Sequence, residues 1–399
     1  MSVRVEPAAA RVHLLERAAS AVLERALAGL EGGTLEVELP SGETRRFGTG
    51  PPVRLAIHDP VFFRRVATRG KLGLGESYSA GEWGSDDMVA LFELLLRNAE
   101  SATSRHALAR RLLELRPRLH RRNGFARSRR NIAYHYDLGN DFFALMLDET
   151  MTYSCAVFDD PRASLAEAQR AKYERLCESL SLGPEDHVLE IGCGWGGFAH
   201  HAAGTRGCRV TGITISHEQA VLARERTQGL AVEIREQDYR EVEGSFTKVV
   251  SIEMVEAIGA DQFGTYFEAI DRVLAPGGRA AVQAILVPEQ RWDRYRSTPD
   301  WIERYIFPGC LIPSLEALAH AAARSSRLGI YGVDEIGVHY AETLRRWRAS
   351  FHEQIREVRE LGYDRRFERT WDFYLAFCEA AFRTRVLRDA QLLFARAGE

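Results

Sequence analysis

The sequence predicts an α/β fold with a doubly wound parallel sheet in its C-terminal part and a smaller α+β unit before it. Two observations support this prediction. From about residue 165, amphipathic helical segments alternate with short apolar strands, and the first of these strands leads into a glycine-rich stretch at 192–197. Such alternation places parallel strands in one sheet with helices on both faces.

The elements of the C-terminal part follow one another closely. Helices are expected at 165–180, 198–205, 218–228 and 262–273, and strands at 187–191, 209–215, 231–236, 248–252 and 279–286. After about residue 330 the chain is expected to be largely helical, because aromatic residues such as Trp347 and Trp371 recur on amphipathic segments. This end is therefore expected to be a helical addition to the sheet domain.

The N-terminal part has fewer elements. An amphipathic helix is expected at 11–30, strands at 34–39 and 53–57, and helices at 62–67 and 88–97, with glycines between 70 and 84 breaking the region between the last two. A chain of 399 residues exceeds one ordinary domain of ~100 to 200 residues. We therefore expect one domain over 1–104, a linking segment over 105–130 and a second domain over 131–399.

Composition narrows the class of protein. Hydrophobic residues make up 45% of the chain and charged residues 27%, which is ordinary for a globular protein and disfavours a collagen-like, disordered or disulfide-framework chain. The sequence has neither an apolar run of about 18 residues nor a signal-peptide pattern, so a cytoplasmic protein is expected. The six cysteines lack a C-x-x-C pair, which disfavours a zinc site and predicts reduced thiols. We expect no metal.

The segment 105–130 is strongly basic, with ten arginines and one acidic residue, Glu114. Its leucines keep roughly helical spacing, so it predicts either a solvated linking helix or a helix attracted to an anionic surface. Each basic residue close to an acidic bilayer contributes roughly 1 kcal/mol. Nucleic acid is a weaker interpretation, because no aromatic side chains interleave with the arginines.

The glycine-rich stretch indicates a nucleotide-like cofactor. The strand 187–191 runs into Gly192, Gly194 and Gly196 and then into a helix. At the carboxyl edge of a parallel sheet, glycines permit a tight turn and close approach of the backbone to a ligand. The spacing departs from the G-x-G-x-x-G of a pyrophosphate-binding loop, which favours S-adenosylmethionine over a dinucleotide.

The ends of the next two strands supply further candidates for cofactor contacts. After the third strand, the Asp238 carboxylate is suited to accept a hydrogen bond from an adenine amino group, and Gln237 and Tyr239 flank it. The second strand ends without an acidic residue, so polar contacts are expected from a different set. That set is Thr214, Ser216 and Gln219, for which ordinary loop polarity is the alternative interpretation.

Several segments, read together, resemble the cyclopropane-fatty-acyl-phospholipid synthase family. They are 134–141, 151–155, the glycine-rich stretch, 212–216, 237–240 and 304–309. The resemblance is strong over about 131–395, and over the first 120 residues it extends only to length and general pattern. It implies a Rossmann-like class I methyltransferase domain preceded by a small lipid-facing domain. It also adds Tyr136, Tyr153 and Ser154 to the expected cofactor contacts.

The resemblance implies an enzyme that works at the inner face of the membrane, with homo-oligomers possible. It would transfer the methyl of S-adenosylmethionine to the cis double bond of an unsaturated phospholipid acyl chain. An alkene is a weak nucleophile, so positive charge develops on carbon, and aromatic faces in a dry pocket stabilise that charge. A base then removes a proton. Loss from the new methyl with ring closure gives a cyclopropane, and loss after hydride migration gives a methylene branch.

In this family the base is thought to be bicarbonate. The resemblance assigns its binding to the backbone of Cys155, Glu256, the backbone of Ile285 and Tyr340, and the position of the family's histidine holds Gln283. Glutamine binds an oxyanion but does not titrate near neutral pH. A cyclopropane product is therefore expected, with a mid-chain methylene- or methyl-branched chain as the alternative.

Two other carboxylates lie near this set. Glu149 is a candidate to assist, although a solvated position is the commoner interpretation of such a residue. Glu253 lies three residues before Glu256, but paired carboxylates are more often solvated than catalytic, and the resemblance favours Glu256 alone.

Two hypotheses from other functional classes also remain. One is a nucleic-acid methyltransferase, which the arginine-rich segment would serve. The other is a lipid-binding protein without catalytic activity, which would not bind S-adenosylmethionine.

Overall fold

The computed structural model describes residues 27, 29–105, 138–298 and 300–398. The chain forms two compact units, the first built from the N-terminal region with 298–301 and 362–384, and the second from the rest. The helix predicted at 11–30, apart from residues 27, 29 and 30, and the basic segment 105–130, apart from residue 105, lie outside the described residues.

The first unit holds a four-stranded sheet in the order β2-β1-β3-β4. β1 alternates buried and half-buried residues, as a strand with one covered face should. β2 was not predicted, because its residues are half-buried or exposed and none is apolar except one phenylalanine. The elements of the unit are β1 (Gly33–Glu38), β2 (Thr44–Thr49), β3 (Pro52–Ile57), β4 (Trp83–Gly84), α2 (Val61–Ser79), α3 (Met88–Arg105) and α16 (Arg365–Arg383).

Helix α16 packs inside this unit, although the sequence placed it in the second domain. Phe373 of α16 contacts Phe92 of α3 with ring centroids 4.9 Å apart, and the Tyr78 hydroxyl of α2 donates to Asp372 at 2.7 Å. The expected glycine breaks are also fewer than predicted, since α2 kinks at Gly70 and continues to Ser79. At Gly75 a Cβ would lie 2.3 Å from the Trp301 indole, so glycine there serves close packing.

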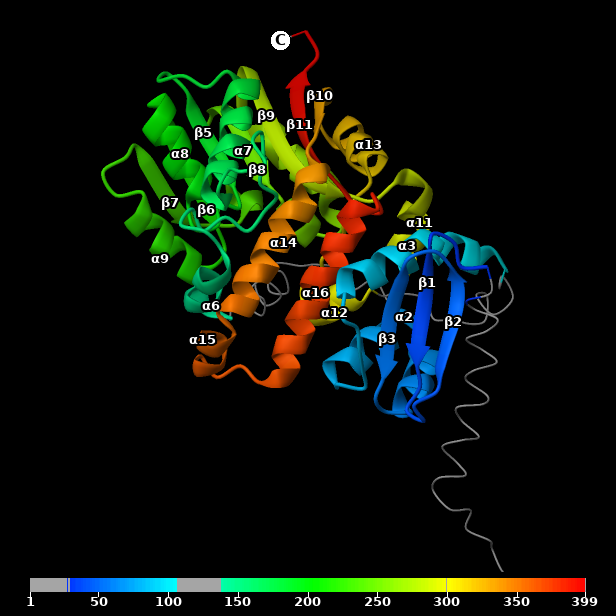
Figure 1. The fold of residues 1–399 in the computed structure, drawn as a ribbon. Coiled ribbons are helices and arrows are strands. Elements are labelled where there is room, and N and C mark those ends of the chain that lie inside the picture. Colours follow the sequence, from blue (N-terminus) through cyan, green and yellow to red (C-terminus); the bar gives the residue numbers. More distant parts are fainter. Residues whose placement is uncertain (1–26, 28, 106–137, 299, 399) are drawn as a thin grey trace, which may run out of the picture. The chain divides into compact units, whose positions relative to one another are not determined.

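The second unit contains a seven-stranded sheet in the order β10-β11-β9-β8-β5-β6-β7, visible as the helix-covered sheet of Figure 1. Strands β5 to β9 of this sheet pair in parallel with one another, which confirms the predicted α/β class. The strands are β5 (His187–Ile191), β6 (Arg209–Thr214), β7 (Val232–Glu236), β8 (Phe246–Ile252), β9 (Leu274–Leu286), β10 (Leu328–Glu335) and β11 (Arg388–Arg396).

The largely helical character expected after about residue 330 is confirmed by α14 (Gly337–Glu353), α15 (Ile355–Glu360) and α16, but two strands of this region were not foreseen. β10 and β11 are antiparallel additions, with β11 paired to β9 and drawn in red beside it in Figure 1. β11 carries Asp389, Gln391 and Arg396, all of them buried, so its composition does not read as an apolar strand.

Helices cover both faces of this sheet. Val188, Val250 and Ala281 pack on the face covered by α7 and α8, whereas their neighbours Leu189 and Val249 pack on the face covered by α10 and α13. This period of two is what a sheet buried on both sides requires. The remaining elements are α6 (Gly139–Met146), α7 (Leu165–Leu180), α8 (Gly197–Arg206), α9 (His217–Arg226), η1 (Tyr239–Glu241), η2 (Val255–Ala257), η3 (Ala260–Gln262), α10 (Phe263–Val273), α11 (Glu289–Ser297), α12 (Trp301–Tyr305), α13 (Leu315–Ser325), α14 (Gly337–Glu353) and α15 (Ile355–Glu360).

The strand order reverses beside β5, with β6 on one side and β8 on the other. Ligands of open α/β sheets bind at such a switch point, beyond the carboxyl ends of the strands. Within the described part of the chain, no helix has the length and apolar character needed to cross a membrane.

Candidate active site

The glycine-rich loop follows β5 with its backbone in the left-handed region. Gly192, Gly194 and Gly196 have φ values of 80°, 53° and 81°. A Cβ built at Gly194 would meet no atom within 4 Å, so the backbone there faces open space. The preceding Glu190 is buried, and its Oε2 has no hydrogen-bond partner in the described structure. An open glycine backbone beside an unsatisfied buried carboxylate suits a ligand that carries a positive charge.

Burial raises the pKa of Glu190 to about 8, and the charge of Lys172 and a hydrogen bond from the Ala199 backbone oppose the shift only in part. The folded state therefore holds a proton that the unfolded state releases above its ordinary pKa of 4.5. We expect stability to fall as pH rises from 4.5 to 8 and this loss to end above 8. In Glu190→Gln the slope in that window should be less negative by about 1.4 kcal/mol per pH unit.

Urea unfolding of the cofactor-free protein at several pH values measures this slope. Glu185→Gln, an exposed change that precedes the same strand, is the control and should leave the slope unchanged. Equal slopes for Glu190→Gln and the unmodified protein would contradict the assignment of a buried neutral carboxyl.

The candidates after β6 and β7 lie at the same edge of the sheet, but several of their polar atoms serve local turns. The Thr214 hydroxyl donates to Gln219 Oε1 at 2.7 Å, and Ser216 Oγ accepts from the Gln219 N–H at the start of α9. Asp238 accepts from the Arg240 guanidinium at 2.7 Å. These contacts are local to the turns. They therefore support the alternative interpretation, in which Thr214, Ser216 and Asp238 are polar because they stabilise the loops themselves.

Two further candidates of this group differ in their surroundings. The Gln237 amide donates to the Glu241 carbonyl at 3.0 Å on the surface. Tyr239 is buried, and its hydroxyl has no partner among the described residues. Tyr136, which the resemblance added to the set, lies outside the described residues.

Tyr153 and Ser154 lie in the extended segment before α7. The Tyr153 ring packs 5.1 Å from Trp347 and 5.3 Å from Phe143, measured between centroids. Ser154 Oγ accepts from the Lys172 ammonium at 2.7 Å. The Tyr340 ring meets Trp347 edge-on at 6.1 Å, so Tyr153, Trp347 and Tyr340 form a continuous aromatic wall.

Three predicted residues converge on a carboxylate that the sequence analysis set aside. Glu253 Oε1 accepts from the Cys155 backbone N–H at 2.7 Å and from Gln283 Nε2 at 2.8 Å. Glu253 Oε2 accepts from the Tyr340 hydroxyl at 2.6 Å. We call Cys155, Glu253, Gln283 and Tyr340 the Glu253 cluster.

The backbone of Glu253 is unusual as well. Its φ is 49°, in the left-handed region that costs a non-glycine residue roughly 1 to 2 kcal/mol. Its N–H donates to the Gln283 carbonyl at 2.8 Å, which fixes the turn directly after β8. A strained residue held by its surroundings is typical of functional sites.

Glu256 and Ile285 form a separate pair beside the Glu253 cluster. The Ile285 backbone N–H donates to Glu256 Oε1 at 2.6 Å, and Glu256 Oε2 is buried without a partner in the described structure. Burial and the nearby charge of Glu253 raise the pKa of Glu256 to about 8. The residues assigned to a bicarbonate ion are thus divided between two carboxylates of the chain itself.

Two buried ionisable residues next to this cluster were not foreseen. Asp389 of β11 accepts from Gln283 Nε2 at 3.2 Å, and burial together with the charge of Glu253 raises its pKa well above the usual range. Lys172 of α7 is fully buried, and burial lowers its pKa to about 8 despite the charges of Glu253 and Asp389. Near neutral pH the region therefore combines one lysine ammonium with protonated Asp389 and Glu256.

Glu149 lies elsewhere. Its side chain is 68% exposed and pairs with Arg170 on the surface. The structure therefore does not bring this candidate to the Glu253 cluster.

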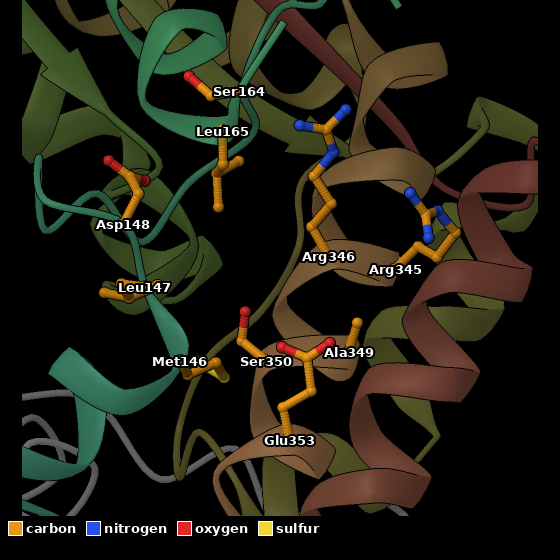
Figure 2. Close-up of a pocket in the computed structure, with 10 residues that line it drawn as sticks. All are labelled: Met146, Leu147, Asp148, Ser164, Leu165, Arg345, Arg346, Ala349, Ser350 and Glu353. Carbon is orange, nitrogen blue, oxygen red and sulfur yellow. The ribbon is translucent and has the colours of Figure 1, made fainter. Parts of the chain in front are cut away.

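A pocket of about 420 Å³ lies beside α14 (Figure 2). Arg345, Arg346, Ala349, Ser350 and Glu353 of α14 line one side, and 146–148 with 164–165 line the other. Both arginines also pair with Glu342 of the same helix. The pocket lining includes no member of the Glu253 cluster, so we do not assign it to the reacting centre.

A group of possible metal ligands lies between α7 and α8. Glu174, Cys177 and His201 place their ligand atoms within 4.8 Å of one another in the described part of the chain. Glu174 is already paired with Arg206, and Cys177 is packed in the core with a raised pKa of about 12 from burial. We assign no metal to this group.

Known proteins are similar to this chain over most of its length. The family model of mycolic acid cyclopropane synthetase matches residues 124–392. The tuberculostearic acid methyltransferase of Mycobacterium tuberculosis is 40% identical over an alignment of 399 positions that covers 96% of this chain and 92% of that protein. The cyclopropane-fatty-acyl-phospholipid synthase of Escherichia coli K12 is 37% identical over 348 residues, covering 87% and 89%.

Solved structures agree with the fold. The cyclopropane synthase MmaA2 of Mycobacterium tuberculosis matches with a TM-score of 0.63 at 27% identity, over 67% of this chain and 98% of that one. The mycolic acid cyclopropane synthase CmaA1, solved with S-adenosylhomocysteine and CTAB, matches with a TM-score of 0.62 at 27% identity, over 67% and 97%. The expected Rossmann-like class I methyltransferase fold is therefore confirmed.

Proposed function

The chain belongs to the mycolic acid cyclopropane synthetase family and is an S-adenosylmethionine-dependent lipid methyltransferase, and we propose that its acceptor is the cis double bond of an unsaturated phospholipid acyl chain. The observation that carries the proposal is the Glu253 cluster beside an aromatic wall at the carboxyl edge of β8 and β9. Alkene methylation needs both of these features. Aromatic faces stabilise a carbocation, and polar groups at the same place are suited to hold the base that removes a proton.

The cofactor is expected to lie over the glycine-rich loop. Gly194 offers its backbone to open space, and the unpaired Glu190 Oε2 is suited to accept from the ammonium group of S-adenosylmethionine, whose positive charge would lower the raised pKa that this carboxyl has in the cofactor-free protein. The bound cofactor supplies a sulfonium methyl group. The residues after β6 and β7 would then surround the nucleoside part, with Tyr239 as an apolar face.

Gly194→Ala is expected to raise the dissociation constant of S-adenosylmethionine at least tenfold, roughly 1.4 kcal/mol. The added methyl would enter the open space at Gly194 and sit in a left-handed conformation. Gly204→Ala is the matched control, since its Cβ also meets nothing within 4 Å, but on an exposed turn of α8. Calorimetric titration measures both, and an unchanged constant for Gly194→Ala would contradict the placement of the cofactor.

We propose a methylene-branched acyl chain as the product, with the cyclopropane as the second candidate. The branched product is supported by Gln283, whose amide donates to Glu253 at the position where the resemblance expects a histidine. It is also supported by the 40% identity to tuberculostearic acid methyltransferase along almost the whole chain. The cyclopropane is supported by the 37% identity to the synthase of Escherichia coli.

The test is incubation with methyl-labelled S-adenosylmethionine and phospholipid vesicles that carry a cis-monounsaturated chain. Mass spectrometry of the acyl product after ozonolysis separates the two, because a methylene group is cleaved and a cyclopropane is not. Absence of label from the acyl chains, with label in added RNA or DNA, would establish a nucleic-acid methyltransferase instead.

We propose that the protein binds the surface of anionic membranes through the ten arginines of 105–130. Replacing five of them by glutamine should weaken sedimentation with vesicles rich in phosphatidylglycerol. Unchanged sedimentation would contradict this role.

A further inference from the structure

We infer that the Glu253 carboxylate is itself the base that accepts the proton after methyl transfer, in place of a bound bicarbonate ion. The inference rests on the proposed function, because it names the base of that same reaction. Three lines of observation support it: the donors around Glu253, its backbone, and the charges nearby.

The first line is that the donors expected to hold a bicarbonate are already used. The Cys155 N–H, the Gln283 amide and the Tyr340 hydroxyl all donate to the two oxygens of Glu253, at 2.6 to 2.8 Å. The Ile285 N–H donates to Glu256. A carboxylate and a bicarbonate present the same planar pair of oxygens, so Glu253 fills the site that the ion would need. Bicarbonate does not fit these residues as they stand.

The second line is the backbone of Glu253. Its φ of 49° belongs to a region where glycine is favoured, yet the chain places a glutamate there. Because this turn follows β8 directly, the left-handed conformation directs the side chain into the cluster. A purely structural turn has no need of a carboxylate under strain.

The third line is the charge of the groups around Glu253 and the exposure of Glu253 itself. Asp389 and Glu256 are buried beside Glu253 and take the neutral form, while the Lys172 ammonium remains to balance one negative charge. Glu253 is half-buried, whereas Asp389 and Glu256 are buried. Of these three carboxyl groups, Glu253 is therefore the one most accessible to a ligand, and its two oxygens accept three hydrogen bonds.

The proton transfer balances without another reactant. The S–CH₃ bond breaks as a C–C bond forms to the alkene, which leaves a positive charge on the neighbouring carbon. A hydride moves to that carbon from the newly methylated carbon, which then carries the positive charge, and a C–H bond of the new methyl group breaks. Its electron pair forms the C=C bond of the methylene branch, and its proton passes to an oxygen of Glu253. In the cyclopropane alternative, no hydride moves and the same electron pair closes the ring.

Two substitutions of Glu253 in the full-length protein separate an internal base from a bound ion. Glu253→Gln keeps the shape but accepts no proton, so turnover should fall about 100-fold or more and added bicarbonate should not restore it. Glu253→Gly suits the φ of 49° and frees the three donors. Its turnover should be equally low in bicarbonate-free buffer and recover at least tenfold with 50 mM sodium bicarbonate, a concentration chosen as roughly saturating.

The unmodified enzyme should keep its turnover when bicarbonate is removed, and calorimetry with sodium bicarbonate should show binding to Glu253→Gly alone. Glu268→Gln, on the exposed face of α10, is the control and should behave as the unmodified enzyme. Turnover of the unmodified enzyme that depends on bicarbonate, or full turnover of Glu253→Gln, would overturn the inference. S-adenosylmethionine binding and thermal melting of both variants report folding. Failure of the proposed function is distinct, because the unmodified enzyme would then label no acyl chain.

Discussion

Replacing Asp271 by alanine is expected to lower the free energy of unfolding by about 3 to 5 kcal/mol. Asp271 lies near the end of α10, and its carboxylate accepts from the Arg396 guanidinium of β11 at 2.7 Å. The Arg396 side chain is only 6% exposed, so its charge has no water to replace the lost partner. Leaving one charge of a buried pair alone is among the most destabilising changes.

The surroundings of Arg396 explain why the pair is worth this much. Its remaining N–H groups donate to the carbonyls of Asp271, Leu274 and Ala275, all where α10 passes into β9. Burial alone would raise the pKa of Asp271, but hydrogen bonds from Arg327 and Arg396 outweigh it and lower the pKa. The stabilisation is thus present above the ordinary pKa of 3.8 and is lost as pH falls through the lower, folded value.

Urea unfolding at pH 7 measures the effect. Asp261→Ala, an exposed aspartate just before the same helix, is the matched control and should change stability by less than about 0.5 kcal/mol. A loss of less than 1 kcal/mol for Asp271→Ala would show that the Arg396 guanidinium finds other acceptors.

Strand β11, which carries Arg396, shows where the sequence pattern no longer predicts secondary structure. The elements from α7 to β9 were predicted within a few residues, because each has one apolar face and strand and helix periods alternate. β10 is largely exposed, and β11 buries Asp389, Gln391 and Arg396. Polar residues in a buried strand are stabilised only by partners on distant elements, and no local pattern reports those partners.

The candidate site, too, could be predicted from the sequence only in part. Cys155, Gln283 and Tyr340 were found through the resemblance, and the structure brings them together. Glu253 was set aside because a paired carboxylate is usually solvated. One signal in the sequence did favour it, since it follows the last residue of a predicted parallel strand and so lies at the carboxyl edge.

Lys172→Met is expected to lower turnover about 100-fold at pH 7. Lys172 is buried on α7, its ammonium donates to Ser154 Oγ at 2.7 Å, and it is the cation next to Glu253 and Asp389. Without this positive charge, Ser154 and the carboxyl groups around Glu253 lose the buried cation that is paired with them. Methionine keeps the apolar length of the side chain, so the fold should survive.

The pH profile separates this role from simple packing. Because the pKa of Lys172 is about 8, turnover of the unmodified enzyme should decline as pH rises through 8, where the ammonium loses its charge. Lys172→Met should lack that decline, because methionine carries no charge to lose. Lys248→Met, a half-buried lysine on β8, is the matched control and should keep the pH profile of the unmodified enzyme. A Lys172→Met profile that is merely scaled down at every pH and still declines through pH 8 would assign Lys172 to packing.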